Sequence, residues 1–198
     1  DYNQYCYYVA GTVGHMATEM AVDFYNMSGQ YVAQLHVTSE ACGRGLQKTN
    51  IVKDFAKDLQ RGDCFLPGEW LQEVNYTPLT LAGAPDTWKE KVLTNVLVEF
   101  EDSVNYILDL PLSAVGFRKA SLLMMLPGYQ TLLKAARNHD YLFTPAHEIR
   151  ISRRTMAKCL LDARLMVSNN DAIMAYSRDI RTELSKALDS DRMVATST

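Results

Sequence analysis

The sequence lacks any apolar stretch long enough to cross a membrane. Its longest uninterrupted apolar run, residues 122–127, is far shorter than the roughly 20 residues that a membrane-spanning helix requires. The chain opens on Asp1-Tyr2-Asn3, with neither an initiator Met nor the charged and apolar regions of a secretion signal. We therefore expect no transmembrane segment, and a chain that begins within a longer protein.

Paired cysteines and excess positive charge are also missing. The four cysteines, at positions 6, 42, 64 and 159, form no CxxC pair, so we expect free thiols in a reducing compartment rather than disulfides or a zinc site. The 198 residues carry 20 basic and 23 acidic side chains, a net charge of −3. A chain with this balance has no overall positive field to attract nucleic acid, so we expect no nucleic-acid partner.

The charge is unevenly distributed along the chain. Residues 1–110 hold 7 basic and 15 acidic side chains, whereas residues 111–198 hold 13 basic and 8 acidic ones. An acidic half can attract a hard cation, and a basic half can attract a phosphate. The motifs GxSxG and GxGxxG and the P-loop are absent, and the four histidines have no metal-binding spacing, so nothing supports acyl transfer or nucleotide hydrolysis.

Helical spacing of apolar residues dominates what is present. With 47% hydrophobic residues and no alternating strand pattern, the sequence predicts an all-α chain of six to seven helices. We expect one helical domain over residues 1–188 and a polar tail over residues 189–198 that frays. The predicted helices cover residues 2–25, 40–60, 86–110, 113–137, 153–167 and 169–188, and a loop with a short helical turn covers 63–85.

Local signals set several of these boundaries. Ser39 and Ser152 are predicted N-caps, because a serine hydroxyl can accept a hydrogen bond from a free N–H of the first helical turn. The turn at residues 27–29 is expected to end the first helix. Pro127 is expected to kink its helix, because proline removes one backbone donor.

One helix carries a polar stripe that points to metal binding. Gln47, Asn50, Asp54 and Asp58 are spaced at i, i+3, i+7 and i+11, which places them on one face of a helix. Two aspartates four residues apart repel each other unless a cation lies near them, and Mg²⁺ prefers carboxylate oxygens. The alternative is a solvated helix face in which Lys53 and Lys57 are ordinary pairing partners, and a bare DxxxD pattern is more often of that kind.

A second unusual segment lies near the start of the chain. Residues 5–14 read YCYYVAGTVG, with three tyrosines ahead of two glycines. A glycine inside a helix costs about 1 kcal/mol relative to alanine, so a pair of them needs a reason. Ala10, Gly11 and Gly14 would form a flat surface on which another backbone or a ligand can approach closely. For any single tyrosine, amphipathic packing against the core is the alternative to a catalytic role.

Together these two segments resemble the squalene/phytoene synthase family. The match rests on YCYYVAGTVG at residues 5–14, followed in order by LQKTNIVKDFAKD at residues 46–58. The run QKTN at residues 47–50 is more similar to squalene synthases than to phytoene synthases, and FLP at residues 65–67 also resembles the family. The likeness weakens after residue 67 but continues through the helix of Pro127 to the stretch at residues 149–153.

The resemblance implies an isoprenoid-synthase-type helical bundle and a specific chemistry. Squalene synthases join two farnesyl diphosphates head to head through presqualene diphosphate to squalene, using Mg²⁺ and NADPH. By this resemblance Asp54 and Asp58 are metal ligands, Gln47 and Asn50 support the substrate diphosphate, and Tyr5 is the catalytic tyrosine. Two basic positions, Arg150 and with it Arg153, match positions linked to the NADPH phosphate. Their alternative is an exposed basic cluster.

Two departures from the family pattern qualify this picture. Lys53 and Lys57 stand where the family usually has Arg and Glu, while both aspartates are kept. The family's first aspartate-rich motif is not found, because Glu19 and Asp23 follow Tyr5 instead of preceding it. We therefore expect the C-terminal portion of a synthase, inactive by itself, whose partner is a missing N-terminal portion or a second copy of the chain.

Other functions stay open at this stage. One alternative is phytoene or dehydrosqualene synthesis, which differs in whether NADPH changes the product. Another is a non-catalytic, synthase-like protein that acts in assembly or interaction, although such a protein has no need for the polar stripe. The resemblance further implies a cytoplasmic location, an isoprenyl diphosphate substrate and peripheral membrane contact through the apolar product.

Overall fold

The computed structural model describes residues 2–27 and 30–189. Its elements are α1 (Tyr2–Cys6), the π-helical segment η1 (Tyr7–Gly11), α2 (Thr12–Phe24), α3 (Gln30–Gln60), α4 (Gly68–Val74), the 3-10 turn η2 (Leu81–Gly83), α5 (Asp86–Asp109), α6 (Val115–Arg137), the 3-10 turn η3 (His139–Tyr141), α7 (Arg153–Met166) and α8 (Asn170–Asp189). No β-strand occurs within those two ranges, so the all-α prediction is confirmed for the described part of the chain.

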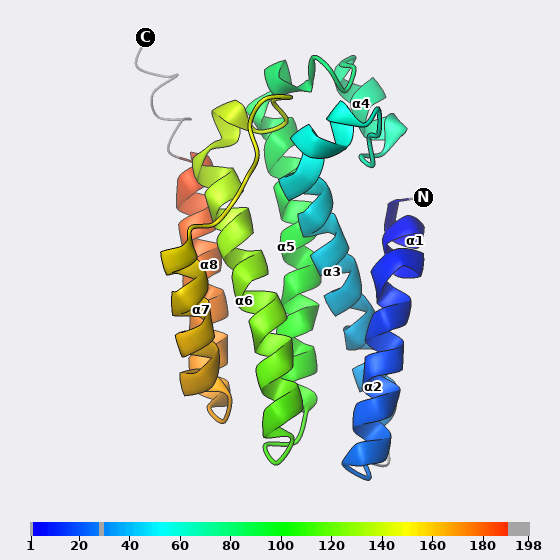
Figure 1. Cartoon of the computed structure of the whole chain (residues 1–198), viewed down its shortest axis with the longest axis vertical. Helices are drawn as coiled ribbons and strands as arrows, with labels where there is room; N and C mark the ends of the chain where they lie inside the picture. The colour runs from blue at the N-terminus through cyan, green and yellow to red at the C-terminus, as the bar shows by residue number, and fades with distance from the viewer. Residues whose placement is uncertain (1, 28–29, 190–198) are drawn as a thin grey trace.

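The long helices form a bundle with α3, α5 and α6 at its centre (Figure 1). The continuous helix α1–η1–α2 lies along one edge against α3, while α7 and α8 pack on α6 at the opposite edge. The short helix α4 and the loop around it sit at one end of the bundle. None of the helices in the described ranges combines the length and apolar character that crossing a bilayer requires.

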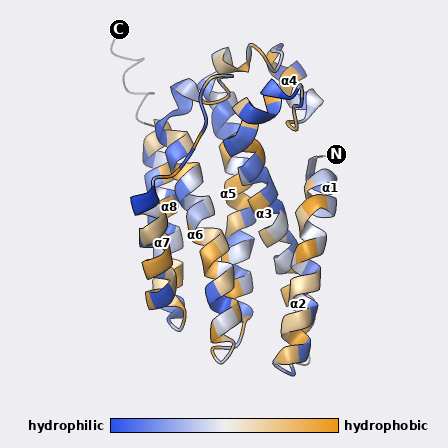
Figure 2. Cartoon of the chain, viewed as in Figure 1, coloured by the Kyte–Doolittle hydropathy of each residue, from blue (hydrophilic) through white to orange (hydrophobic). Residues whose placement is uncertain are grey.

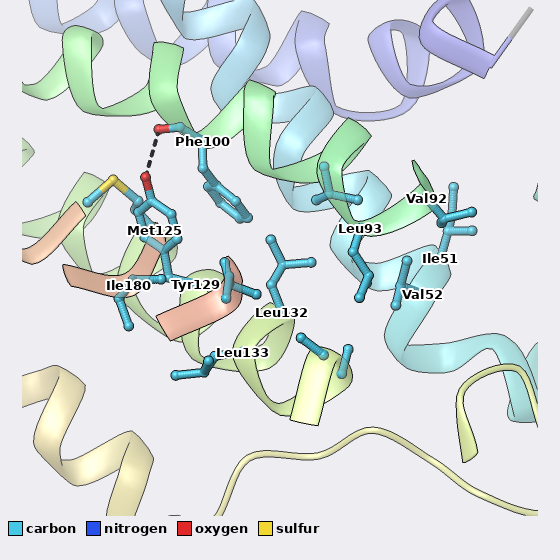
Figure 3. Packing of buried hydrophobic residues seen from close by; sticks show 14 of the residues in the cluster. Ile51, Val52, Val92, Leu93, Phe100, Met125, Tyr129, Leu132, Leu133 and Ile180 are labelled. Atoms are coloured by element: carbon cyan, nitrogen blue, oxygen red, sulfur yellow. Dashed lines mark hydrogen bonds between the residues drawn. The ribbon is translucent and has the colours of Figure 1, made fainter. Parts of the chain in front are cut away.

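The core is built from the apolar faces of the central helices. Ile51 of α3, Val92 and Phe100 of α5 and Leu132 of α6 are each at most 3% exposed and pack together (Figure 3). The hydroxyl of Tyr129 donates a hydrogen bond to the Phe100 carbonyl at 3.3 Å, so its polar atom is satisfied inside this core. A packed core of this kind fixes α3, α5 and α6 relative to one another.

The predicted start of the second helix is wrong. Helix α3 begins at Gln30, nine residues before Ser39, and Ser39 lies inside it with 1% exposure. Its hydroxyl donates to the His36 carbonyl at 2.9 Å, so it does not cap a helix. The other predicted cap is confirmed, because Ser152 Oγ accepts a hydrogen bond from the Thr155 N–H at 3.0 Å.

The remaining boundaries agree with the sequence to within a few residues. Helix α6 runs from Val115 through Pro127 without a break in the helical assignment, and the kink expected there stays a prediction. Helix α8 ends at Asp189, one residue beyond the expected limit of the helical domain. The expected turn at residues 27–29 and the fraying tail at residues 189–198 lie outside the described residues except for their first positions, residues 27 and 189.

Glycines allow the first helix to lie directly on α3. A methyl group at Gly14 would place its carbon 2.3 Å from the carbonyl oxygen of Ser39, and one at Gly43 would lie 2.2 Å from the carbonyl oxygen of Ala10. Only hydrogen fits at either position, so the two backbones are in contact. The flat surface predicted from residues 10–14 is confirmed, and what approaches it is the backbone of α3.

Candidate active site

The polar stripe lies along one side of α3, where the apolar side of the same helix holds it against the core. Ile51 and Phe55 are buried at 3% and 4% exposure, whereas Asn50 is exposed and Asp54 and Asp58 are partly exposed. The helical period therefore separates the two sets as the sequence predicts. We call Gln47, Asn50, Asp54 and Asp58 the polar stripe.

The two aspartates of the stripe act on each other. Partial burial raises the pKa of Asp58, and the negative charges of Asp54 and Asp63 raise it further, against Arg61 and Lys57. Lys53 Nζ lies 2.7 Å from one carboxylate oxygen of Asp54 and offsets part of this negative charge. A cation placed between the two carboxylates would relieve the remaining repulsion.

Tyr5 reaches the same stripe from the neighbouring helix. Its ring stacks on Phe65 with centroids 5.5 Å apart and planes inclined by 15°, and 37% of the residue is exposed. Burial raises the pKa of Tyr5, and Cys6 and Asp58 act in the same direction, while a hydrogen bond with the Gln47 side chain lowers it. The structure thus brings together three predicted site residues, Tyr5, Gln47 and Asp58.

The π-helical segment η1 follows Tyr5 directly. A π-turn holds more backbone per turn than an α-helix, and such turns are frequent at functional sites. Because η1 stands between α1 and α2, the residues of α1 face α3 at a different angle than an unbroken α-helix would give them. The segment therefore sets the direction in which Tyr5 points relative to the glycine contact with α3.

A groove beside the stripe collects further predicted residues. Asn50, Asp54 and Lys57 of α3 line it, together with Pro127 of α6 and Arg150 from the segment before α7. Arg150 also forms an ion pair with Glu148, and its side chain is 72% exposed. Arg153, the other predicted basic residue, is exposed at the first position of α7 and does not line the groove.

An apolar cavity adjoins this groove. It lies between α2, α3, α5 and α6 and is walled by side chains such as Phe100, Ile107 and Phe117. Leu46 and Met124 line both hollows, so the apolar cavity and the polar groove share part of their wall. The apolar cavity has about 50 Å³ of free space, so an amphiphile with its charged head in the groove would reach it with only the start of a hydrocarbon tail.

A network of buried charges lies on another face of α3. Lys48, 1% exposed at its side chain, places Nζ 2.6 Å from Glu99 of α5, and Arg44 Nε donates to both Glu99 carboxylate oxygens at 3.1 Å. Arg44 also pairs with Glu40, and Lys48 lies over the ring of Tyr2, 5.4 Å from its centroid. We call Glu40, Arg44, Lys48 and Glu99 the charge network. Sequence reasoning missed it, because nothing local links residues of α3 to a glutamate 51 positions after Lys48.

The donor set of the stripe suits Mg²⁺ in part. Asp54 and Asp58 offer the hard carboxylate oxygens that this ion prefers, one helical turn apart. Within residues 2–27 and 30–189, no three acidic, histidine or cysteine side chains converge closely enough to hold a metal by themselves. Two carboxylates fit an ion that keeps several waters and takes its other ligands from a substrate phosphate.

Comparison with known proteins decides the family. The family model described as squalene/phytoene synthase matches residues 1–155, which include every site residue predicted from the sequence. The chain belongs to the squalene/phytoene synthase family. The resemblance drawn from residues 5–14 and 46–58 is thereby confirmed.

The relatives of this chain include both squalene synthases and phytoene synthases. Squalene synthase ERG9 of Saccharomyces cerevisiae is 28% identical over 192 residues, which cover 93% of this chain and 41% of that protein. Phytoene synthase of Pseudescherichia vulneris is 39% identical over 77 residues, or 38% of this chain and 22% of that protein. A bifunctional lycopene cyclase/phytoene synthase of Arthroderma gypseum is 34% identical over 104 residues, covering 52% and 18%. The chain spans less than half the length of these relatives.

Proposed function

We propose that this chain forms one wall of an active site that condenses two isoprenyl diphosphates head to head, in the manner of a squalene synthase. The observation that carries the proposal is the shared wall of the polar groove and the apolar cavity at Leu46 and Met124. A diphosphate in the groove would direct its hydrocarbon tail at the cavity, which has about 50 Å³ of free space and must widen to take the chain. The tail is then shielded from water, as a reaction through a carbocation requires.

In this proposal the stripe binds the diphosphate end of the substrate. Asp54 and Asp58 would hold Mg²⁺, which when bound neutralises the departing diphosphate. Asn50 and Gln47 can donate amide hydrogen bonds to phosphate oxygens. Lys53 and Lys57 add positive charge beside the same oxygens, which supports leaving-group stabilisation even though they replace the family's usual Arg and Glu.

Tyr5 would act near the reacting carbons. Its raised pKa keeps the phenol protonated at neutral pH, so it can donate a hydrogen bond but does not serve as a base in its resting state. The exposed face of its ring, stacked on Phe65 on the other side, offers electron density to a nearby cation. The Gln47 side chain, which lowers the pKa of Tyr5, is the residue of the stripe that meets its hydroxyl.

A reducing step with NADPH is the finer part of the proposal. Arg150 lines the groove together with Lys53 and Lys57 and would meet a cofactor phosphate there, and Arg153 lies three residues further along, on α7. The second candidate, phytoene or dehydrosqualene synthesis, is favoured by the phytoene synthases among the relatives and needs no reductant at this site. Adding NADPH should change the product in the first case and leave it unchanged in the second.

A second wall is needed in either case. Two carboxylates from this chain cannot complete the coordination of several ions on two diphosphates. Further aspartates, from a longer form of this chain or from a second copy, would supply the missing metal ligands. A non-catalytic role in assembly is the remaining alternative, and the convergence of Tyr5, Gln47 and Asp58 argues against it, because an interaction protein has no need for that arrangement.

The proposal is tested by calorimetric titration of the 198-residue chain with farnesyl diphosphate. We expect weak binding that depends on Mg²⁺ and is lost when Asp54→Asn and Asp58→Asn are combined. Asp171→Asn, at an exposed aspartate in the first turn of α8, is the control and should bind like the original chain. Binding that persists in the double variant, or that needs no Mg²⁺, would contradict the assignment.

Turnover separates the two condensation products. The chain alone should convert no farnesyl diphosphate, whereas a longer form that adds the family's first aspartate-rich motif should convert it. With NADPH present, chromatography of the extracted products distinguishes squalene from an unreduced hydrocarbon. Equal turnover by the two forms would show that one wall is sufficient.

A further inference from the structure

Two histidines meet between α2 and α3, several helical turns before the polar stripe. His15 Nδ1 lies 3.3 Å from His36 Nδ1. The ring centroids are 5.5 Å apart and the ring planes are inclined by 16°. Because the centroids lie farther apart than the two nitrogens, the rings turn their Nδ1 edges toward each other. No spacing in the sequence marks these residues as a pair, since 21 positions separate them.

A glutamate holds each histidine from its other side. His36 Nε2 lies 3.1 Å from a carboxylate oxygen of Glu19, and His15 Nε2 lies 3.4 Å from one of Glu40. The second oxygen of Glu40 is in contact with Arg44, so this carboxylate is itself held in place. A carboxylate can only accept a hydrogen bond, so each Nε2 carries its ring proton. Each neutral ring therefore presents a lone pair at Nδ1.

The two facing lone pairs need a positive charge between them. A third proton is one candidate, but charge-assisted hydrogen bonds are usually about 2.7–2.9 Å long, so the gap of 3.3 Å is wide for a shared proton. Two nitrogens at about 2.0–2.1 Å from a tetrahedral Zn²⁺ lie roughly 3.3–3.4 Å apart. Such an ion lies to one side of the line between the nitrogens, so each ring would turn slightly toward it. The separation therefore suits a metal better than a proton.

The surroundings of the pair also favour a cation. Residues 1–43 contain four acidic side chains and no lysine or arginine, so this edge of the bundle attracts positive charge. Helix α2 is mostly hydrophobic (Figure 2), and His15, Glu19 and Asp23 are its only titratable residues. The side chains of His15 and His36 are 32% and 24% exposed, which leaves an open side for water ligands.

We propose that His15 and His36 bind a divalent transition-metal ion through their Nδ1 atoms. Imidazole nitrogen suits Zn²⁺, Ni²⁺ and Cu²⁺, whereas Mg²⁺ prefers oxygen ligands. Histidines that bind a metal usually donate their other ring N–H to a carboxylate, so Glu19 and Glu40 act as positioning residues. In the described part of the chain no three acidic, histidine or cysteine side chains can hold a metal together, so water would complete the coordination.

The ion would tie α2 to α3 next to their backbone contact at Gly14. It would stabilise the edge of the bundle, because it binds the folded chain through residues of two helices. The site contains no residue of the polar stripe, the groove or the apolar cavity other than the neighbouring Gly14. The inference therefore does not depend on the proposed function.

Calorimetric titration of the 198-residue chain with zinc chloride tests the inference. The chain should bind Zn²⁺, and its melting temperature should rise with the ion. His15→Gln and His36→Gln should each abolish this binding. Glu19→Gln keeps both ligands and should weaken the binding by about tenfold. The matched control is His147→Gln, at an exposed histidine outside the pair, which should bind like the original chain.

Nuclear magnetic resonance of the ¹⁵N-labelled histidine rings adds a readout of the bound atom. Zn²⁺ should shift the Nδ1 signals of His15 and His36, and Mg²⁺ should not. Circular dichroism of every variant checks that it remains folded. No binding of Zn²⁺ by the original chain would overturn the inference, as would undiminished binding by both histidine variants. A pair whose signals respond to pH but not to Zn²⁺ would assign the bridge to a proton and overturn it equally.

Discussion

Helix α3 presents charged residues to two different surroundings, and the contrast separates support from function. In the charge network, Lys48 and Arg44 meet Glu99 at 2.6 to 3.1 Å, and their charges are neutralised inside the bundle. In the polar stripe, partial burial and the neighbouring charge of Asp54 raise the pKa of Asp58, and Lys53 offsets only part of the negative charge. Charges that are already paired inside the bundle support the fold, whereas a partly exposed pair of carboxylates that repel each other is suited to binding a cation.

The comparison predicts the largest loss of stability for a change within the charge network. Glu99→Gln leaves the buried ammonium of Lys48 without its carboxylate, which is expected to cost about 3–5 kcal/mol in free energy of unfolding. Urea denaturation followed by circular dichroism measures this value.

A surface pair provides the control for that change. Lys91 and Glu73 are also in contact, at 2.5 Å, but their side chains are 44% and 50% exposed. Glu73→Gln should therefore cost less than about 1 kcal/mol. If the two variants lose equal stability, the charge network does not behave as a buried one.

An intermediate effect is expected where the first helix meets α3. Gly43→Ala would press a methyl group into the carbonyl of Ala10, costing about 1–3 kcal/mol by overpacking, partly offset by the helix propensity of alanine. The first helix would have to move away from α3 to make room for the methyl group. Tyr5 would move with it, away from the polar stripe, and diphosphate binding would weaken. Gly68→Ala, where no atom lies within 4 Å of the added methyl, should leave both stability and binding intact.

The smallest effect on stability is expected in the polar stripe. The raised pKa of Asp58 means that the folded chain holds this proton more tightly than the unfolded chain, so ionised Asp58 disfavours folding above that pKa. Asp58→Asn should therefore give an equal or slightly higher melting temperature at neutral pH. The difference should vanish as pH falls through the raised pKa, and thermal melts across pH measure it.

The sign of this effect distinguishes Asp58 from an ordinary helix aspartate. Asp171 lies in the first turn of α8, where a negative charge interacts favourably with the helix dipole. Asp171→Asn should therefore lower the melting temperature slightly at neutral pH. A clear loss of stability in Asp58→Asn would place that carboxylate among the structural charges instead.

The sequence predicted most helices because their boundaries depend on local signals. Ser152 caps α7 as expected, and α5 ends before Pro111. Ser39 has the same cap preference but lies in mid-helix, where its hydroxyl bonds to the His36 carbonyl and its backbone packs under Gly14. A local cap signal cannot reveal that a neighbouring helix supports the chain on both sides of the serine.

In the site, too, the sequence predicted what depends on local pattern and missed the contacts between different helices. The polar stripe follows from helical period alone, and the expectation that Tyr5 belongs with it came from the family resemblance. The pairing of Lys48 with Glu99 joins different helices, and neither residue has a sequence neighbour that marks it as buried. Likewise, the separation of Arg150 from Arg153 depends on where α7 begins relative to the groove, which is a tertiary property.

The π-helical segment η1 has a consequence at the level of the gene. Loss of one codon within Tyr7–Gly11 could restore an ordinary α-helix and rotate Tyr5 by about 100°, the angular step of a single residue. The glycines that contact α3 would keep their places while the tyrosine turned from its partners. The position of Tyr5 relative to these glycines thus depends on the number of residues in η1. Deletion of one residue there is therefore expected to be more damaging than most substitutions in the same helix.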